Sequence, residues 1–268
     1  MSLLRFPEPY DFELSMGRFR AFGTDVANRF EDGTLHRVVA GRAVRIVARP
    51  GGVDVEPHDP ETLRVVAHLL GAPFDLDAFY AFAADDAVLA PIVARLRGFR
   101  PPLQPEPFEA LITSITAQQV SLFAAVAIRN RFVERFGDRV DGEWAFPTRE
   151  RIAASDEHEL VEVGFTRRKA EYAVALARAD LDLHALAQED DDAVRAAITA
   201  QRGLGPWTAE WFLARHLARP RAWPAGDLVL RKAAEDLYRV DVTELGRRLD
   251  PFQNLAAHYL LTGWMTRP

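Results

Sequence analysis

The sequence predicts an α+β protein, in which a small mixed α/β domain over residues 1–88 precedes a larger all-α domain over residues 89–268. Short β-rich runs occur only between about residues 35 and 57. From Phe74 onward the strand pattern disappears, and apolar residues recur at the 3.6-residue period of helices. Four prolines within residues 97–107 mark a connection ahead of most of these helices.

The N-terminal elements follow from alternation and turn residues. The runs LHRVVA, AVRIVAR and VDVEP predict three strands within residues 35–57. The breaks between them, Ala40-Gly41-Arg42 and Pro50-Gly51-Gly52, are typical of hairpin turns. Asp59-Pro60 then opens an amphipathic helix, PETLRVVAHLL, with proline in its first turn.

The helices of the larger domain follow from periodicity and capping residues. Residues 107–136 predict either one long helix or a bent pair. Thr148 and Thr166 each open a helix, and the acidic run at residues 189–192 is favoured at a helix start by the helix dipole. Further helices are expected at residues 206–217, 227–238, 242–249 and 253–265.

Composition limits the function classes. The chain has 268 residues, 49% hydrophobic and 27% charged, which is typical of a folded globular protein. Cysteine is absent, which excludes disulfides, thiol catalysis and cysteine-ligated zinc or iron–sulfur clusters. No run of eighteen apolar residues occurs and the start lacks a signal-peptide pattern, so we expect a cytoplasmic protein without a membrane partner.

Net charge alone argues against a nucleic-acid partner, because it is −6 at pH 7. Binding depends on where the basic residues lie, however, and residues 201–268 carry ten basic and seven acidic side chains. Only Lys169 and Lys232 are lysines among the 33 basic residues, which limits any mechanism that needs a catalytic lysine.

The first of three motifs is QRGLGPWTAE, residues 201–210, between two predicted helices. Its Gly-x-Gly turn allows positive φ and leaves the amides of the following helix free to bind an anion such as a phosphodiester. The same residues also suit an ordinary turn between helices, with Pro206 at the first helical position.

The second motif, WPAGDL at residues 223–228, places Asp227 at or near a helix N-cap. The carboxylate could serve as a cap, which stabilises a helix by about 1 kcal/mol. It could also stand at the mouth of a pocket, and the two roles are compatible because a cap fixes the carboxylate in space.

The third motif, ITAQQVS at residues 115–121, interrupts an apolar helix with uncharged polar residues. Three interpretations remain open from the residues alone: a buried polar network, a surface stripe, or side chains pushed into a ligand. Gln118 and Gln119 are the candidates for the last of these.

Together the motifs resemble, in order and spacing, those of the helix-hairpin-helix DNA glycosylases, most closely the DNA-3-methyladenine glycosylase II (alkylbase DNA glycosidase) branch. The likeness runs from about Phe6 to Trp264 and includes PFEALITSITAQQVS, GFTRRKAEYAVALA and NLAAHYLLTGW. It implies a helix-hairpin-helix glycosylase fold for the larger domain. It also implies a base excision repair enzyme that flips alkylated purines, of the 3-methyladenine and 7-methylguanine class, out of duplex DNA and hydrolyses their glycosidic bonds.

The resemblance assigns roles to individual residues. It implies that Asp227 is catalytic and that Gln119 is the wedge that fills the space left by the flipped nucleotide, next to Gln118 at the substrate. Lys169 is expected to contact a phosphate or to be a solvated surface charge, as is Lys232. The hairpin that grips DNA would comprise Gly203, Leu204, Gly205 and Thr208. The family also binds a monovalent cation through hairpin carbonyls, here those of Thr199, Gln201 and Leu204, and no cofactor is needed for catalysis.

Aromatic side chains are expected to stack on the cationic base, because electron-rich ring faces attract a cation. The resemblance places Trp207, Trp211 and Trp264 there, with Tyr259 as a looser match. As residues of amphipathic helices, Trp211, Tyr259 and Trp264 could equally belong to the core. One departure is Arg202, where a proline commonly precedes the first hairpin glycine.

The sequence also separates branches of the family. Bifunctional members carry a Schiff-base lysine just after the hairpin, where this chain has Trp207, so we expect a monofunctional enzyme without lyase activity. We expect a monomer on double-stranded DNA with no obligate protein partner. The alternatives are a glycosylase of the same fold for deaminated or oxidised bases and a non-catalytic helix-hairpin-helix DNA-binding or damage-recognition protein. Asp227 argues against the latter, because binding alone needs no carboxylate facing phosphates.

Overall fold

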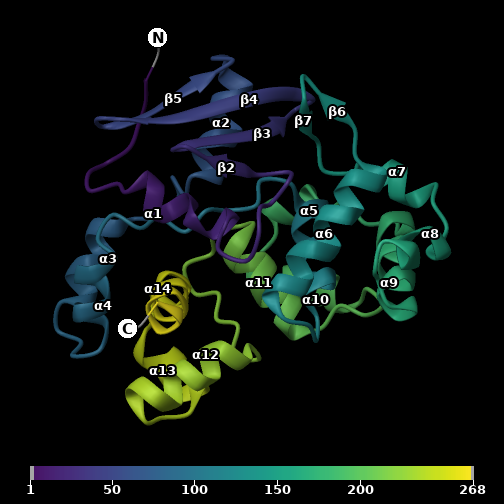
Figure 1. Ribbon diagram of the computed structural model, residues 1–268. Coiled ribbons are helices and arrows are strands. Elements are labelled where there is room, and N and C mark those ends of the chain that lie inside the picture. Colours follow the sequence, from purple (N-terminus) through teal and green to yellow (C-terminus); the bar gives the residue numbers. More distant parts are fainter. Residues whose placement is uncertain (1–2, 267–268) are drawn as a thin grey trace.

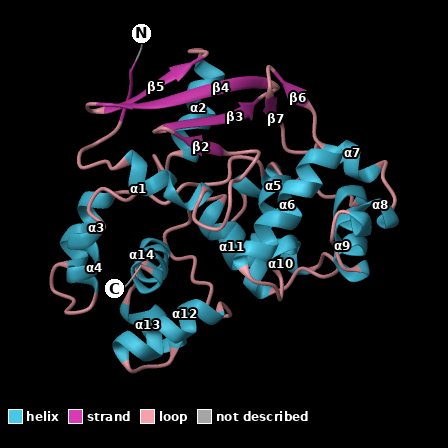
Figure 2. Ribbon diagram, viewed as in Figure 1, coloured by secondary structure: helices cyan, strands magenta, loops and turns pink. Residues whose placement is uncertain are grey.

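An antiparallel five-stranded sheet forms the N-terminal part of the computed structural model, which describes residues 3–266 (Figures 1 and 2). The strand order is β1-β5-β4-β3-β2. The three predicted strands are confirmed as the centre of this sheet, whereas its two three-residue edge strands were not expected. The strands are β1 (Leu3–Arg5), β2 (Arg29–Glu31), β3 (Thr34–Val39), β4 (Arg42–Arg49) and β5 (Gly52–Glu56).

One face of the sheet packs against a helix, α2 (Pro60–Leu69). Leu35, Ile46 and Val55 are paired across β3, β4 and β5, and all three are almost fully buried. They meet Val66 of α2 in one apolar cluster. The expected cap is confirmed, since Asp59 accepts a hydrogen bond from the Thr62 N–H at 3.1 Å.

Helices make up most of the rest of the molecule, and most of them lie below the sheet in Figure 1. No helix within residues 3–266 is both long enough and apolar enough to cross a bilayer. The helices are α1 (Phe12–Met16), η1 (Gly17–Phe19), α3 (Leu76–Ala83), α4 (Leu89–Arg95), α5 (Pro107–Ala117), α6 (Leu122–Phe136), α7 (Arg149–Ala153), α8 (Glu157–Glu162), α9 (Arg167–Arg178), η2 (Ala185–Gln188), α10 (Asp191–Thr199), α11 (Pro206–Arg215), α12 (Leu228–Ala233), η3 (Ala234–Tyr238), α13 (Val242–Arg248) and α14 (Gln253–Met265).

Most helix starts lie where their capping residues predict. Thr148, Thr166 and Asp190 each accept a hydrogen bond from the backbone N–H three residues on, at the starts of α7, α9 and α10. The stretch 107–136 is the bent pair, α5 and α6. A short hairpin, β6 (Arg139–Val140) with β7 (Glu143–Trp144), interrupts the region that was expected to be all-α.

Two hydrophobic clusters divide the described chain, one around the sheet and one among the helices. Along the sequence, the first cluster ends at Leu70 and the second begins at Phe74. This change lies ahead of residue 88, and the domain boundary expected there stays a prediction. A buried ion-pair network joins them: Glu109 of α5 binds Arg37 of β3 at 2.9 Å and Arg129 of α6 at 2.5 Å. Because removing one partner would leave a buried charge unpaired, this network fixes the sheet against the helices.

Candidate active site and DNA interface

Asp227 lies at the N-terminus of α12 and caps it. Its Oδ1 accepts hydrogen bonds from the backbone N–H groups of Val229, at 2.9 Å, and Leu230, at 3.1 Å. The positive end of the helix therefore faces the carboxylate and fixes its direction. The capping role is thus confirmed, and the side chain is partly exposed, whereas its predicted place at the mouth of a pocket stays a prediction.

Two tryptophans hold the other oxygen of Asp227. The indole Nε1–H groups of Trp207 and Trp211 both donate to Oδ2, each at 3.2 Å. The two residues stand four positions apart on α11 and so share one helix face. Four N–H groups thus surround the carboxylate and stabilise its negative charge, a use of these indoles that the sequence analysis did not foresee.

The two indoles differ in what remains accessible. Trp207 is partly exposed. Trp211 is only 2% exposed, and the guanidinium of Arg215 lies 3.6 Å from its ring centroid. Here the structure differs from the expectation that Trp211 stacks directly on substrate, because an arginine already covers its ring. Sequence reasoning missed Arg215, although its i+4 spacing from Trp211 was a visible signal.

The predicted hairpin connects α10 to α11. Gly203 has φ of +83°, and a Cβ at this position would come within 2.2 Å of the Tyr172 ring, so only glycine fits. Gly205 is extended and precedes Pro206, the first residue of α11. The turn therefore brings its backbone to the surface at a helix N-terminus, which suits a phosphate.

Leu204 and Thr208 anchor the hairpin from inside. Leu204 is 5% exposed and Thr208 is 1% exposed. The Thr208 N–H already donates to the Gly205 carbonyl at 2.9 Å, so this residue differs from the expectation that it contacts DNA. The Gln201 carbonyl accepts the Leu204 N–H at 3.1 Å, while the Leu204 carbonyl accepts no main-chain hydrogen bond within residues 3–266. The cation site expected at the carbonyls of Thr199, Gln201 and Leu204 stays a prediction.

The loop between α5 and α6 projects from the surface. Gln119 is exposed and has a left-handed backbone, with φ of +55°, which turns the chain sharply between the two helices. Ser121 caps α6. Around these polar residues the loop carries exposed apolar side chains, namely Val120, Leu122 and Phe123, the last being 64% exposed.

The loop and the hairpin are in direct contact. Gln118 Nε2 donates a hydrogen bond to the Gly203 carbonyl at 3.0 Å. The first and third sequence motifs therefore form one continuous surface. Gln118 contributes as a brace within this surface, which the sequence alone did not predict.

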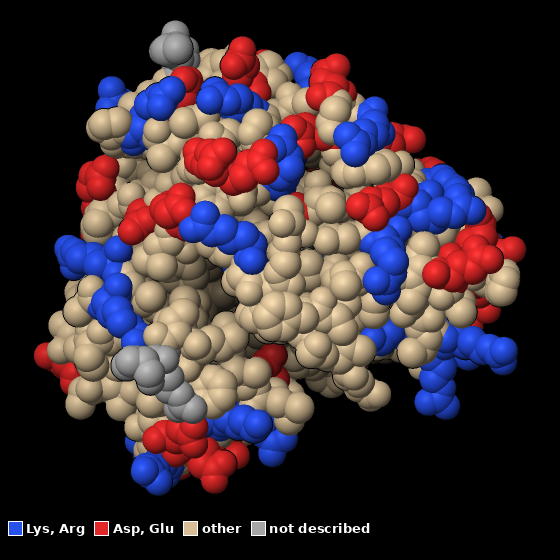
Figure 3. All heavy atoms as spheres, viewed as in Figure 1, with Lys and Arg blue, Asp and Glu red and all other residues tan. Residues whose placement is uncertain are grey.

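Lys169 points into the protein. Its side chain is 7% exposed, and Nζ donates to the Thr116 carbonyl in α5 at 3.0 Å. Burial lowers the pKa of its ammonium. This differs from the expected phosphate contact, because the ammonium binds the end of α5 instead. The adjacent Arg167 and Arg168 are exposed. Figure 3 shows mixed charges on the face it presents, without a single basic patch.

Tyr259 and Trp264 both lie on α14. Tyr259 is fully buried, and its hydroxyl donates to the Phe99 carbonyl at 2.7 Å, so it is a core residue and differs from the expected pocket role. Trp264 is partly exposed, and its Nε1–H donates to Asp236 at 3.0 Å. It also lines a cavity of about 350 Å³ between α4 and α14.

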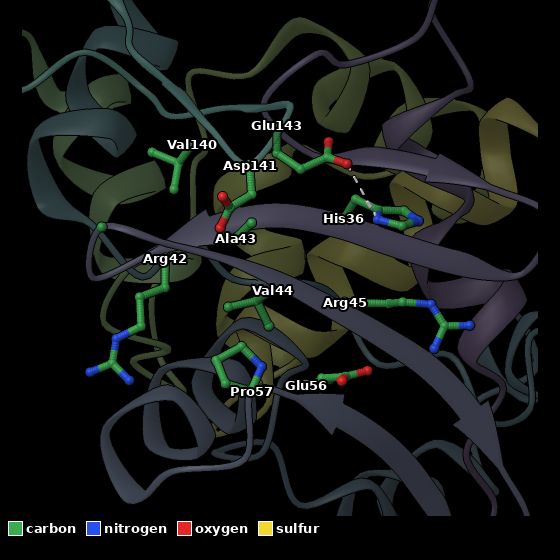
Figure 4. Close-up of a pocket in the computed structure, with 11 residues that line it drawn as sticks. His36, Arg42, Ala43, Val44, Arg45, Glu56, Pro57, Val140, Asp141 and Glu143 are labelled. Carbon is green, nitrogen blue, oxygen red and sulfur yellow. Dashed lines mark ion pairs between the residues drawn. The ribbon is translucent and has the colours of Figure 1, made fainter.

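A larger cavity, of about 510 Å³, lies beside the sheet and the β6–β7 hairpin (Figure 4). His36 and Glu143 approach one another there at 3.4 Å, with Asp141 nearby. Burial, and then the charge of Arg29, lower the pKa of His36. None of the residues predicted for the site lines this cavity, so its size does not make it the candidate active site.

Comparison with known proteins adds independent findings. A model described as "HhH-GPD superfamily base excision DNA repair protein" matches residues 112–249. A DNA-3-methyladenine glycosylase of Bacillus subtilis is 25% identical, over 96% of this chain and 95% of its own length. The structure of a 3-methyladenine DNA-glycosylase from Archaeoglobus fulgidus matches with a TM-score of 0.89 and 28% identity, over 98% of this chain and 97% of that one.

A fold likeness extends to glycosylases of other specificity. A Clostridium acetobutylicum 8-oxoguanine glycosylase/lyase, solved in complex with double-stranded DNA, matches with a TM-score of 0.79 and 19% identity. The match covers 94% of this chain and 90% of that chain. At this identity the likeness shows a shared fold alone.

Proposed function

Because the chain belongs to the HhH-GPD superfamily of base excision DNA repair proteins, we propose that it is a DNA glycosylase that removes alkylated purines from duplex DNA. The family membership predicted from the three motifs is confirmed. The observation that carries the proposal is the carboxylate of Asp227, partly exposed and held by four N–H groups. The 3-methyladenine glycosylases among its relatives support the substrate class.

In this reaction the bond between C1′ of the deoxyribose and a ring nitrogen of the base breaks, and its electron pair leaves with the base. Water adds to C1′ and gives up a proton to solvent. Asp227 stabilises the positive charge that develops on the sugar and orients the attacking water. A second carboxylic acid is unnecessary, because an alkylated purine is already positively charged and leaves as a neutral base.

The base reaches Asp227 by flipping out of the duplex. Flipping costs about a few kcal/mol of unstacking and unpairing energy, and this cost is smallest for a damaged base pair. Gln119 fills the space that the nucleotide leaves, supported by the exposed apolar side chains beside it. Trp207 stacks on the flipped base, since its ring is partly exposed at the carboxylate. Trp264, which is partly exposed on α14, remains a candidate for a second ring.

The hairpin holds the DNA backbone. Backbone amides beside Gly203 and Gly205 face a phosphate at the N-terminus of α11. A monovalent cation bound by the carbonyls of Thr199, Gln201 and Leu204 would add positive charge at that phosphate. Exposed Arg167 and Arg168 supply further contacts, and the protein acts as a monomer on double-stranded DNA.

We further propose that the product is an abasic site and that the strand stays intact. A lyase needs an amine that attacks C1′, and the position after the hairpin is Trp207. Lys169 is bound to a backbone carbonyl inside the protein. Lys232, the other lysine, is exposed on the second turn of α12, and within residues 3–266 it forms no ion pair with Asp227.

The experiment is product analysis on duplex DNA treated with a methylating agent. The expected products are free 3-methyladenine or 7-methylguanine together with abasic sites, and strands that break only after alkaline treatment. Binding without release of any alkylated base would contradict the proposed activity. Strand breaks that form without alkali, and that borohydride traps as a protein–DNA adduct, would contradict the absence of lyase chemistry.

A further inference from the structure

Three basic side chains from distant parts of the sequence converge behind Trp211. Arg18 comes from η1, Arg215 ends α11, and His258 lies in α14. The His258 ring centroid is 5.7 Å from that of Trp211, and the Arg215 guanidinium covers the same indole. Burial, then the charge of Arg18, lower the pKa of Arg215 to about 9, while the negative charge of Asp227 opposes this shift.

This cluster lacks the partners that buried polar groups normally have. Arg215 Nε and His258 Nε2 are both buried without a hydrogen bond. Within residues 3–266 Arg215 forms no side-chain hydrogen bond and no ion pair, and the one recorded bond of the Arg18 guanidinium is a 3.5 Å contact with the Pro102 carbonyl. Buried polar groups normally have hydrogen-bond partners, so the unpaired Nε–H of Arg215 is a donor that a further partner would satisfy.

The cluster is reachable and adjoins the catalytic carboxylate. Arg18 and Arg215 are both partly exposed, and Figure 3 shows the surface hollowed between α14 and α11. The indole that Arg215 covers donates its N–H to Asp227. Arg215 is thus linked to Asp227 through a single side chain, that of Trp211.

Guanidinium groups only donate hydrogen bonds. In guanine the purine 6-substituent is the acceptor O6, whereas in adenine it is an N6 amine that donates. Alkylated guanine and alkylated adenine are both cationic, so the arginines repel the charge of both bases. The two bases therefore differ toward the arginines in their 6-substituent, which accepts a hydrogen bond in guanine and donates one in adenine.

Resting on the proposed glycosylase function, we propose that Arg215, assisted by Arg18, recognises the carbonyl oxygen at the 6-position of the flipped purine. Arg215 is thus a specificity-determining residue that favours guanine-derived lesions such as 7-methylguanine over 3-methyladenine. His258, uncharged because burial holds its pKa well below the usual value, lies behind the arginines and adds no third positive charge.

The test uses the full-length protein on methylated duplex DNA, which contains both lesions, so that one incubation gives both release rates. Each rate is corrected for spontaneous depurination. In Arg215→Met the ratio of 7-methylguanine to 3-methyladenine release is expected to fall about tenfold, the discrimination of one good base contact. Arg215→Lys keeps the charge but loses the planar fork, and its ratio should fall as well. Arg49→Met, on the distant β4 strand, is the matched control and should keep the wild-type ratio.

The outcomes separate the specificity proposal from the glycosylase proposal. A ratio that stays at the wild-type value in both Arg215 variants, while both bases are released, would overturn the specificity proposal alone. Equal losses for both bases would assign Arg215 a purely structural role beneath Trp211 and overturn it too. Release of neither base by the wild-type protein would overturn the glycosylase function and this inference together. Unfolding midpoints of each variant establish that the protein compared is folded.

Discussion

Gln118 donates a hydrogen bond from its side-chain amide to the main-chain carbonyl of Gly203, across 3.0 Å. The contact joins the loop after α5 to the turn before α11, although 85 residues separate them in the sequence. Under the proposed function, the wedge that enters the duplex and the hairpin that holds the backbone are therefore one connected surface. A phosphate bound at the hairpin sets the position of the wedge.

Gln118→Ala is expected to weaken binding to a duplex that contains an abasic-site analogue by about fivefold, the value of one ordinary hydrogen bond. Filter binding or fluorescence anisotropy measures this. Gln188→Ala, an exposed glutamine at the end of η2, is the control and should bind like the wild type. Equal affinities for all three proteins would show that the contact does not organise the DNA-binding surface.

Trp207→Phe removes one indole N–H from Asp227 and keeps an aromatic ring. Single-turnover base release should fall about tenfold, since a hydrogen bond to a charged group contributes about 1.5–3 kcal/mol. DNA affinity should change little. Trp144→Phe, in the β6–β7 hairpin, is the matched control. If both variants release base at the wild-type rate, the indole does not support the carboxylate during the reaction.

Lys169→Met tests the inward direction of the lysine. Because the ammonium binds the Thr116 carbonyl, the variant should leave the salt dependence of DNA binding unchanged. Arg168→Met, one residue earlier and exposed, should reduce the slope of log affinity against log salt by about 0.9 if it neutralises one phosphate. A reduced slope in Lys169→Met would show that Lys169 contacts a DNA phosphate and would contradict its inward direction.

His216 predicts a loss of stability in acid. Burial lowers its pKa to about 4, although its Nδ1–H donates to the Gln104 carbonyl. The unfolded chain therefore binds a proton near pH 6.5 that the folded protein excludes, and stability falls between pH 6.5 and 4 by at most about 1.4 kcal/mol per pH unit. Between pH 7 and 5, the melting temperature of His216→Gln should fall less than that of the wild type. His158 is exposed, so the melting temperature of His158→Gln should fall as much as that of the wild type. Identical falls in melting temperature for all three proteins would contradict the assignment of the acid-induced loss of stability to His216.

Local signals predicted much of the fold. The strands β3 to β5 alternate over five to eight residues, and the caps Asp59, Thr148 and Thr166 act within three residues of the chain. Strands β1, β2, β6 and β7 have only two or three residues each. Their formation depends on a distant or adjoining partner strand, which no short sequence window contains.

The candidate site could be predicted only in part, because some of its contacts also join residues that are distant in the sequence. Asp227 could be placed at a helix N-terminus from its neighbours alone. Helical spacing indicates that Trp207 and Trp211 share a face but does not reveal that both indoles turn to Asp227. The approach of Arg18 to Arg215 depends on packing between segments nearly 200 residues apart, so the sequence carried no signal for it.

The measurement that tests the central claim most directly compares base release by the wild type and by Asp227→Asn. Asparagine can still cap α12 through its side-chain oxygen but lacks the negative charge. Release of alkylated purine from methylated duplex DNA should fall by about a hundredfold or more, the scale of one lost transition-state electrostatic contact, while binding to undamaged duplex persists. An Asp227→Asn variant that releases base at the wild-type rate would contradict the assignment of Asp227 as the catalytic carboxylate.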